Sequence, residues 1–177
     1  MTSKSARCRV AKDTRACHQA LHNDPLLAAL TDGAVSETDY RRALVRFAAF
    51  HAGVEADRHR LGCGQVYTLT PFLHALAADG AAPPYHSRAC GLRSQGELMG
   101  GLYVAYGSLL GRAMMKRPVT TALPLLPHRY MNMPFPTSAW RSLCTDLEAQ
   151  ALHLEGYQPM RTGALKAFKW MQHLLSG

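Results

Sequence analysis

The sequence of 177 residues contains no uninterrupted apolar run near the roughly 20 residues that a transmembrane helix needs, although 47% of its residues are hydrophobic. Its basic start, MTSKSARCRV, is followed by KDTRACHQ rather than by an apolar stretch, so it does not resemble a secretory signal. We therefore expect a cytoplasmic protein without a membrane span.

Regularly spaced cysteines are absent as well. The five cysteines are odd in number and scattered, and no two of them form a C-x-x-C pair (Cys8, Cys17, Cys63, Cys90 and Cys144). This distribution argues against a disulfide framework and against a zinc knuckle. We expect free thiols in a reducing compartment.

Acidic residues are few: 12 Asp and Glu stand against 20 Lys and Arg, which gives a formal net charge of +8. The excess favours an anionic partner, such as nucleic acid, anionic lipid or a ligand with carboxylates or phosphates. However, the basic clusters at 58–60 and 116–117 are not interleaved with aromatic residues, as they would be on a nucleic-acid surface. We expect no nucleic-acid partner, and a solvated basic surface is the simplest interpretation.

Strand patterns, repeats and common catalytic motifs are also absent. No segment alternates β-branched residues with a period of two, and no period of 20 to 50 residues recurs. There is no G-x-S-x-G elbow, P-loop or dinucleotide fingerprint. The sequence predicts one all-α domain over residues 1–177 with about six helices, of which residues 1–7 form a flexible start.

Helical periodicity is the main signal that is present. Ser36, followed by Asp39, is a plausible N-terminal cap, and Thr70 and either Thr137 or Ser138 are two more. Pro118 is expected to end a helix at about Arg117. The expected helices cover 8–22, 40–61, 71–80, the glycine-rich segment to about 117, 139–156 and 158–175, separated by a turn and loop at 25–33, a loop at 81–91 and a proline-broken connection at 124–136.

The segment GGLYVAYGSLLGR, residues 100–112, places four glycines inside one amphipathic helix. Each interior glycine costs roughly 0.5–1 kcal/mol relative to alanine, so several together suggest that something flat or bulky approaches the backbone. Gly107 and Gly111 lie one turn apart on one face. Gly100 and Gly101 are expected to ease the entry of the helix.

Histidines and carboxylates leave two kinds of metal site open. His18 falls on the shoulder of the first apolar stripe, where it is either a satisfied structural residue or an axial ligand of a metal or haem. A carboxylate-bridged di-metal site needs Glu and His on one helical face. Only Glu55 with His59 meets that spacing, and this pair lies in a charged stretch that is typical of a solvated surface.

Two segments read together resemble the haem oxygenase family, most of all its bacterial branch associated with bacteriophytochromes. AKDTRACHQALHNDPLLAAL resembles the proximal helix, whose A-T-x-x-x-H motif carries the iron ligand, and Thr14 and His18 fall in the corresponding places. LYVAYGSLLGR resembles the distal helix, L-Y-V-L-E-G-S-x-L-G-G in bacterial members. Further likeness in YRRALVRFAAFHAGVE, WRSLCTDLE and ALKAFKWM extends it over most of the chain. Tyr103, Gly107, Ser108 and Gly111 match the distal motif.

The resemblance implies a multi-helical bundle with haem between the first, proximal helix and the glycine-rich distal helix. It implies an oxidoreductase that cleaves haem to biliverdin and releases iron and carbon monoxide, using dioxygen and an acidic ferredoxin- or flavodoxin-like electron donor or reductase. His18 would bind the haem iron. Gly107 and Gly111 would let the distal backbone come close, and Ser108 would offer a hydroxyl there.

The resemblance also implies cations for the two haem carboxylates. Arg141 falls where the family places a propionate-binding arginine, and its alternative is a surface arginine on an amphipathic helix. Tyr103, Arg15 and Lys12 are possible helpers, and Arg112 brings a further cation to the distal helix.

Three positions depart from the family pattern. Arg112 replaces a second distal glycine, His22 replaces a glutamate four residues after the proximal histidine, and Tyr106 replaces an acidic or polar residue. A carboxylate at position 22 would tune the basicity of the iron-binding imidazole. These departures keep two alternatives open: a relative that binds haem without degrading it, and a di-iron or cofactorless enzyme built on the same fold.

Overall fold

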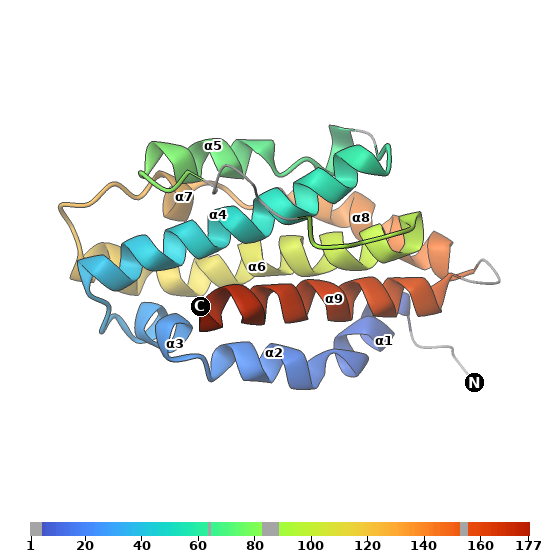
Figure 1. The fold of residues 1–177 in the computed structure, drawn as a ribbon, viewed down its shortest axis with the longest axis horizontal. Coiled ribbons are helices and arrows are strands. Elements are labelled where there is room, and N and C mark those ends of the chain that lie inside the picture. Colours follow the sequence, from blue (N-terminus) through green and yellow to red (C-terminus); the bar gives the residue numbers. More distant parts are fainter. Residues whose placement is uncertain (1–4, 64, 83–88, 153–155) are drawn as a thin grey trace.

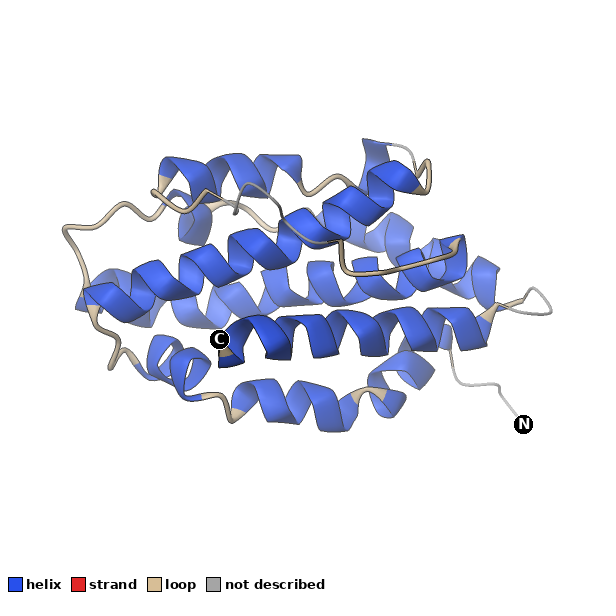
Figure 2. Cartoon of the chain, in the orientation of Figure 1, coloured by secondary structure: helices blue, strands red, loops and turns tan. Residues whose placement is uncertain are grey.

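The computed structural model describes residues 5–63, 65–82, 89–152 and 156–177, and these residues form helices and connecting loops without any strand (Figure 2). Nine α-helices and one short 3-10 helix are present in the described ranges (Figure 1). They are α1 (Ala6–Asp13), α2 (Arg15–His22), α3 (Pro25–Asp32), α4 (Glu37–Arg60), η1 (Gln65–Tyr67), α5 (Thr70–Ala78), α6 (Gln95–Ala122), α7 (Arg129–Asn132), α8 (Thr137–Ala151) and α9 (Tyr157–Ser176). The all-α architecture predicted from the sequence is confirmed.

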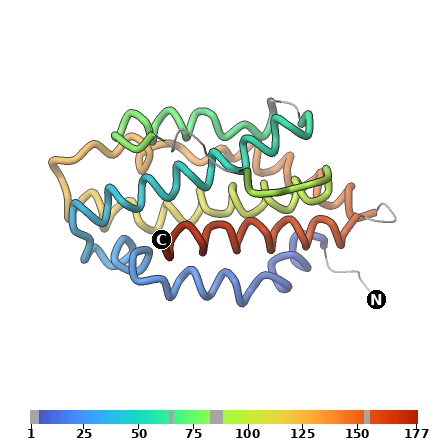
Figure 3. Tube along the Cα trace, in the orientation of Figure 1, coloured from blue at the N-terminus to red at the C-terminus, as the bar shows by residue number. Residues whose placement is uncertain are grey.

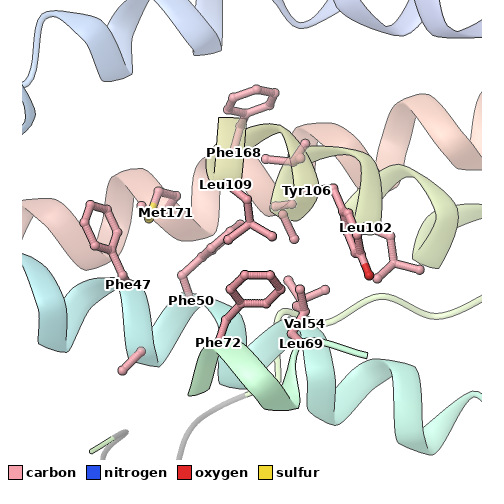
Figure 4. Close-up of a cluster of buried hydrophobic side chains, with 14 of the residues drawn as sticks. Phe47, Phe50, Val54, Leu69, Phe72, Leu102, Tyr106, Leu109, Phe168 and Met171 are labelled. Atoms are coloured by element: carbon pink, nitrogen blue, oxygen red, sulfur yellow. The ribbon is translucent and has the colours of Figure 1, made fainter. Parts of the chain in front are cut away.

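Three long helices, α4, α6 and α9, pack against one another and form the frame of the bundle (Figure 3). The buried core lies where these helices meet α5, and it includes Phe50, Val54, Phe72, Leu102 and Leu109 (Figure 4). Burying such side chains is worth about 1.5–3 kcal/mol each, so this cluster supplies much of the stability. Of the helices described, none is both long enough and apolar enough to cross a bilayer.

Helices α6 and α9 approach each other through glycines. A Cβ atom added to Gly100 would lie 1.9 Å from the carbonyl oxygen of Met160, and one added to Gly163 would lie 1.8 Å from that of Glu97. A Cβ on Gly101 would lie 2.5 Å from Leu92. The prediction that Gly100 and Gly101 ease helix entry is therefore wrong, because both permit close packing instead.

The first predicted helix is divided into α1 and α2 at Thr14. The Thr14 hydroxyl donates to the carbonyl oxygen of Val10 at 2.8 Å, and the residue has φ −102° and ψ 5°. Bonding of this kind from a threonine to the preceding turn bends a helix. Residues 1–4 lie outside the described residues, whereas Ser5 caps α1 and residues 6 and 7 are helical; the predicted flexibility of the start stays a prediction.

Helix α3 replaces the predicted turn and loop at 25–33. Asp24 accepts hydrogen bonds from the backbone N–H groups of Leu26 and Leu27, Pro25 takes the first position, and Gly33 ends the helix with φ 74°. Asp24 and Pro25 thus supply the cap and the first position of a helix where a turn was predicted.

Helix α6 continues through Pro118 to Ala122, so the predicted end at Arg117 is wrong. A proline inside a helix removes one hydrogen bond, in this case to the carbonyl of Met114, a residue that is 70% exposed. The loss is tolerated because water can replace the bond. Pro118 also packs against Gly33, since its Cβ atom lies 3.4 Å from where a Cβ atom on Gly33 would be.

The predicted caps have different outcomes. Ser36 accepts from the N–H of Asp39 as predicted, whereas Thr70 is already the first residue of α5 and Pro136, not Thr137 or Ser138, precedes α8. The connection at 124–136 contains α7, and part of the predicted loop at 81–91, residues 83–88, lies outside the described residues.

Candidate functional site

A cavity of about 1440 Å³ lies between α1–α2 and the middle of α6. Aromatic and apolar side chains of α4 and α9, namely Phe47, Phe50, Phe168 and Met171, are among its lining residues. Pockets for small ligands usually measure about 300–1,000 Å³, so this cavity has room for a large ligand.

Both sides of the cavity are attached to α9. Helices α1 and α2 pack on α9, and so does α6 (Figure 1). Near the break at Thr14, Asp13 accepts a hydrogen bond from the Tyr157 hydroxyl at 2.7 Å and pairs with Arg161 at 3.2 Å. At its other end, α1 donates the N–H groups of Ala6 and Arg7 to the carboxylate of Glu148 on α8.

His18 lines the cavity from α2, a helix without any buried residue. Its ring lies 6.2 Å from that of Phe168 and 4.5 Å from that of His22, measured between centroids. Burial, with a smaller effect of His22, lowers the pKa of His18, which favours the neutral imidazole that binds metals. Among the described residues, none hydrogen-bonds to a ring nitrogen of His18 or His22.

Gly107 and Gly111 line the cavity from α6. A Cβ atom added to either glycine would meet nothing within 4 Å, in contrast to one added to Gly100. The structure thus places both residues beside open space on one helical face. Their predicted contact with a ligand stays a prediction.

Ser108 and Tyr103 also line the cavity. The Ser108 hydroxyl donates to the carbonyl oxygen of Ala105 at 2.7 Å, within the helix. The Tyr103 ring stacks on that of Trp140, with centroids 5.8 Å apart, and burial raises the pKa of its hydroxyl.

Three exposed cations line the cavity from α1 and α2: Arg7, Lys12 and Arg15. None of the three forms an ion pair with an acidic residue in the described part of the chain. Lys12 and Arg15 were predicted. Arg7 was not, because the expected helix began at residue 8, whereas α1 begins at Ala6.

Arg141, the predicted propionate-binding residue, is not among the residues that line the cavity. It is exposed on α8, and its neighbour Trp140 takes the position at the cavity instead. The predicted propionate-binding role of Arg141 therefore finds no support in the position of this residue.

Arg112 touches the cavity, but its charged end is directed at α7. The side chain is 4% exposed, and its guanidinium donates to the carbonyl oxygens of Tyr130 and, at 2.7 Å, Met133. It also lies 5.6 Å from the centre of the Phe72 ring. The role of Arg112 in this structure is to hold α7, and its predicted role as a haem-binding cation finds no support in this geometry.

The Arg112 contacts belong to a buried polar group around α7. Asp79 accepts from the N–H groups of Arg129 and Tyr130, and the Tyr130 hydroxyl lies 3.0 Å from Nε2 of His51. Burial, assisted by the charge of Arg112, lowers the pKa of His51 to about 3. Sequence reasoning missed this group because its members come from distant segments.

Glu55 is buried rather than solvated, which corrects the interpretation of the Glu55–His59 pair. Burial alone would raise its pKa, but hydrogen bonds from Arg58, the N–H of Leu69 and two threonine hydroxyls lower it to about 2. Its carboxylate oxygens are thereby occupied. Within the described residues, no group of three or more His, Cys, Asp or Glu is arranged to hold a metal ion.

The described fold is similar to that of a haem oxygenase from Neisseria meningitidis, solved with NO and CO bound. The TM-score is 0.75 over 98% of this chain and 91% of that one, with 22% sequence identity. The chain has the haem oxygenase fold. No protein-family model and no curated protein matches the sequence. At this identity the likeness establishes the haem oxygenase fold, while the reaction has to be argued from the residues.

Proposed function

We propose that this chain is a haem oxygenase, which binds haem through His18 and cleaves it oxidatively to biliverdin with release of iron and carbon monoxide. The observation that carries this proposal is the cavity, in which His18 lies on one wall and the uncrowded Gly107 and Gly111 lie on the α6 wall. The haem oxygenase fold of the chain supports it.

The residues present fit haem, a large flat apolar molecule with one metal centre and two carboxylates. Phe47, Phe50 and Phe168 offer an apolar lining, and the ring nitrogens of His18 have no described partner to displace. The exposed cations on α1 and α2 could meet the carboxylates. Open space beside Gly107 and Gly111 accommodates a flat ring against bare backbone.

Bound haem supplies the iron and the porphyrin ring on which dioxygen acts. The protein's contribution would be to bind and orient haem: His18 would hold the iron through a ring nitrogen, and the aromatic lining would contact the porphyrin ring. Gly107 and Gly111 would leave bare backbone beside the bound ring. Ser108 reaches that space only when its hydroxyl turns from the carbonyl oxygen of Ala105.

Dioxygen and an external electron donor complete the reaction. A net charge of +8 suits an acidic ferredoxin- or flavodoxin-like donor or reductase, since opposite charges accelerate encounter. The motif LYVAYGSLLGR supports placing the chain near the bacterial branch associated with bacteriophytochromes, and the predicted cytoplasmic location suits such a donor.

A second candidate function is haem binding without degradation, which the position of His22 favours. A metal-binding histidine usually donates its second ring N–H to a carboxylate or carbonyl, which raises its strength as a ligand. Here His22 is the neighbour of His18, and no described carboxylate hydrogen-bonds to either ring. A weaker ligand would slow turnover.

The test mixes the purified protein with hemin under reducing conditions in air and follows the Soret band. Loss of the band with appearance of bilin absorbance is expected, and His18→Ala should abolish both the complex and turnover. His74→Ala, an exposed helical histidine of α5 outside the cavity, is the matched control and should behave as the parent. A stable Soret complex supports the second function, and no complex overturns both.

A further inference from the structure

His18 and His22 form a pair that haem ligation through His18 alone leaves unexplained. They stand four residues apart on α2, so both side chains extend from one helical face. Both line the cavity, and no described group hydrogen-bonds to their ring nitrogens. The same spacing on a helix places two histidines on one metal ion in zinc-dependent proteases.

The distance between the rings matches a chelate. With metal–nitrogen bonds of about 2.0–2.1 Å, two imidazoles bound at a right angle have centroids roughly 4.5 Å apart, and at a tetrahedral angle roughly 5.2 Å. The centroids of His18 and His22 are 4.5 Å apart and the ring planes are inclined by 70°, an edge-on arrangement, so side-chain rotation would bring one nitrogen of each ring onto a shared ion. Right-angled nitrogen ligands are typical of Cu(II) and Ni(II).

The electrostatic surroundings are mixed but permit a cation. Lys12 and Arg15 line the same cavity and repel one, although both are exposed and long enough to turn into water. His22 is the last residue of α2, where the helix dipole favours positive charge. No third His, Cys, Asp or Glu of the described residues joins the pair, so the other positions are left to small ligands.

We propose that His18 and His22 together bind one Cu(II) or Ni(II) ion when haem is absent, and that this ion and haem exclude each other. The chelate itself is independent of the function proposed above. The exclusion rests on that function, because it requires His18 to be the haem ligand. Where the family resemblance implies a glutamate, His22 gives this chain a second imidazole and therefore a competing use for the first.

The experiment titrates haem-free protein with Ni(II) by calorimetry and with Cu(II) by electron paramagnetic resonance. One ion per chain is expected, with coupling to two nitrogens for copper. His18→Ala and His22→Ala should each weaken binding at least tenfold, while His74→Ala should change it less than twofold. Because α2 contains no buried residue, these variants should keep the parent's circular dichroism.

A His22→Ala protein that retains nickel affinity within twofold, or a copper spectrum with one nitrogen ligand, overturns the chelate. Adding hemin to the metal-loaded protein tests exclusion, and one equivalent should release the ion. Hemin binding with the ion retained overturns exclusion. Failure of hemin to bind a protein that chelates metal through both histidines leaves the chelate standing and counts against the proposed function.

Discussion

At the scale of single residues, Arg112 departs most from the resemblance and is the most firmly held cation of α6. Its guanidinium satisfies two carbonyl oxygens of the α7 region, and its side chain is 4% exposed. Because this group is committed to α7, returning position 112 to glycine removes support without clearing an obstacle from the cavity.

We predict that Arg112→Gly lowers the free energy of unfolding by about 3 kcal/mol, combining lost charged hydrogen bonds with the cost of a helical glycine. Arg117→Gly, at an exposed position on the same helix, should cost only about 1 kcal/mol. Urea unfolding measures both. Equal losses of unfolding free energy in the two variants would contradict the structural role of Arg112. Higher haem turnover in Arg112→Gly would show that the arginine does obstruct the cavity.

His51 makes stability depend on pH. Its pKa is lowered to about 3 in the folded protein, against about 6.5 in the unfolded chain, so between these values only the unfolded chain takes up the proton. The contribution of His51 to the free energy of unfolding is fully present above pH 6.5. It is lost as the pH falls toward 3, at up to about 1.4 kcal/mol per pH unit.

We expect His51→Gln to flatten this dependence between pH 6 and 4.5, a window chosen because Glu55, with its pKa lowered to about 2, contributes only below it. The pKa of His18 is lowered too, so wild type retains a second contribution in the same direction that the variant shares. Parallel slopes for the two proteins in chemical unfolding at several pH values would contradict the assignment to His51.

At the scale of elements, the glycines of α6 divide by what surrounds them. We predict that Gly100→Ala destabilises the protein by about 1–3 kcal/mol, because the new Cβ would overlap the backbone of α9. Gly107→Ala should instead raise stability by roughly 0.5–1 kcal/mol, since a helical alanine replaces a glycine beside open space.

The same pair separates stability from ligand binding. Gly107→Ala should weaken hemin binding, measured by Soret titration. The same variant should unfold at a higher temperature than the parent protein. A Gly107→Ala protein that binds hemin with unchanged affinity would remove this glycine from the proposed site. A Gly100→Ala protein as stable as the parent would show that α6 and α9 can separate at little cost.

The sequence was informative wherever the deciding contacts are local. Ser36 with Asp39 fixed the start of α4, and helical periodicity put His18, Gly107 and Gly111 on faces that meet one cavity. It was uninformative where the deciding partner is remote. Asp79 captures the start of α7 from 50 residues away, and Thr70 turns from its expected capping role to Glu55.

The candidate site follows the same division. A resemblance in two segments indicated its main members, whereas the direction of a long side chain depends on packing that no spacing encodes. The guanidinium of Arg112 binds carbonyl oxygens near α7 rather than pointing into the cavity. Trp140, and not Arg141, lines the cavity from α8. Arg7 was missed because the expected helix began at residue 8, whereas α1 begins at Ala6.

At the scale of the whole molecule, the two sides of the cavity differ in how strongly they are built in. Helix α6 carries many buried residues, α1 carries two, Ala6 and Val10, and α2 carries none. Segments with few buried contacts open most easily. The wall with His18 is therefore the less stable one.

We predict that amide hydrogens of α1–α2 exchange at least about tenfold faster than those of α6 and α9, equal to about 1.4 kcal/mol less protection. Hemin should slow exchange in α1–α2 selectively, as measured by mass spectrometry. Uniform exchange across the four helices would contradict this difference between the walls.

The contacts of Asp13 with Tyr157 and Arg161 attach the less stable wall of the cavity to α9 at the junction of α1 and α2. We expect α1 and α2 to move about this attachment while the bundle of α4, α6 and α9 stays packed. Under the proposed function, haem would then enter and its cleavage product leave without unpacking the core. Weakening this attachment with Asp13→Asn should increase the rate at which bound hemin is released, while the unfolding temperature of the protein changes little.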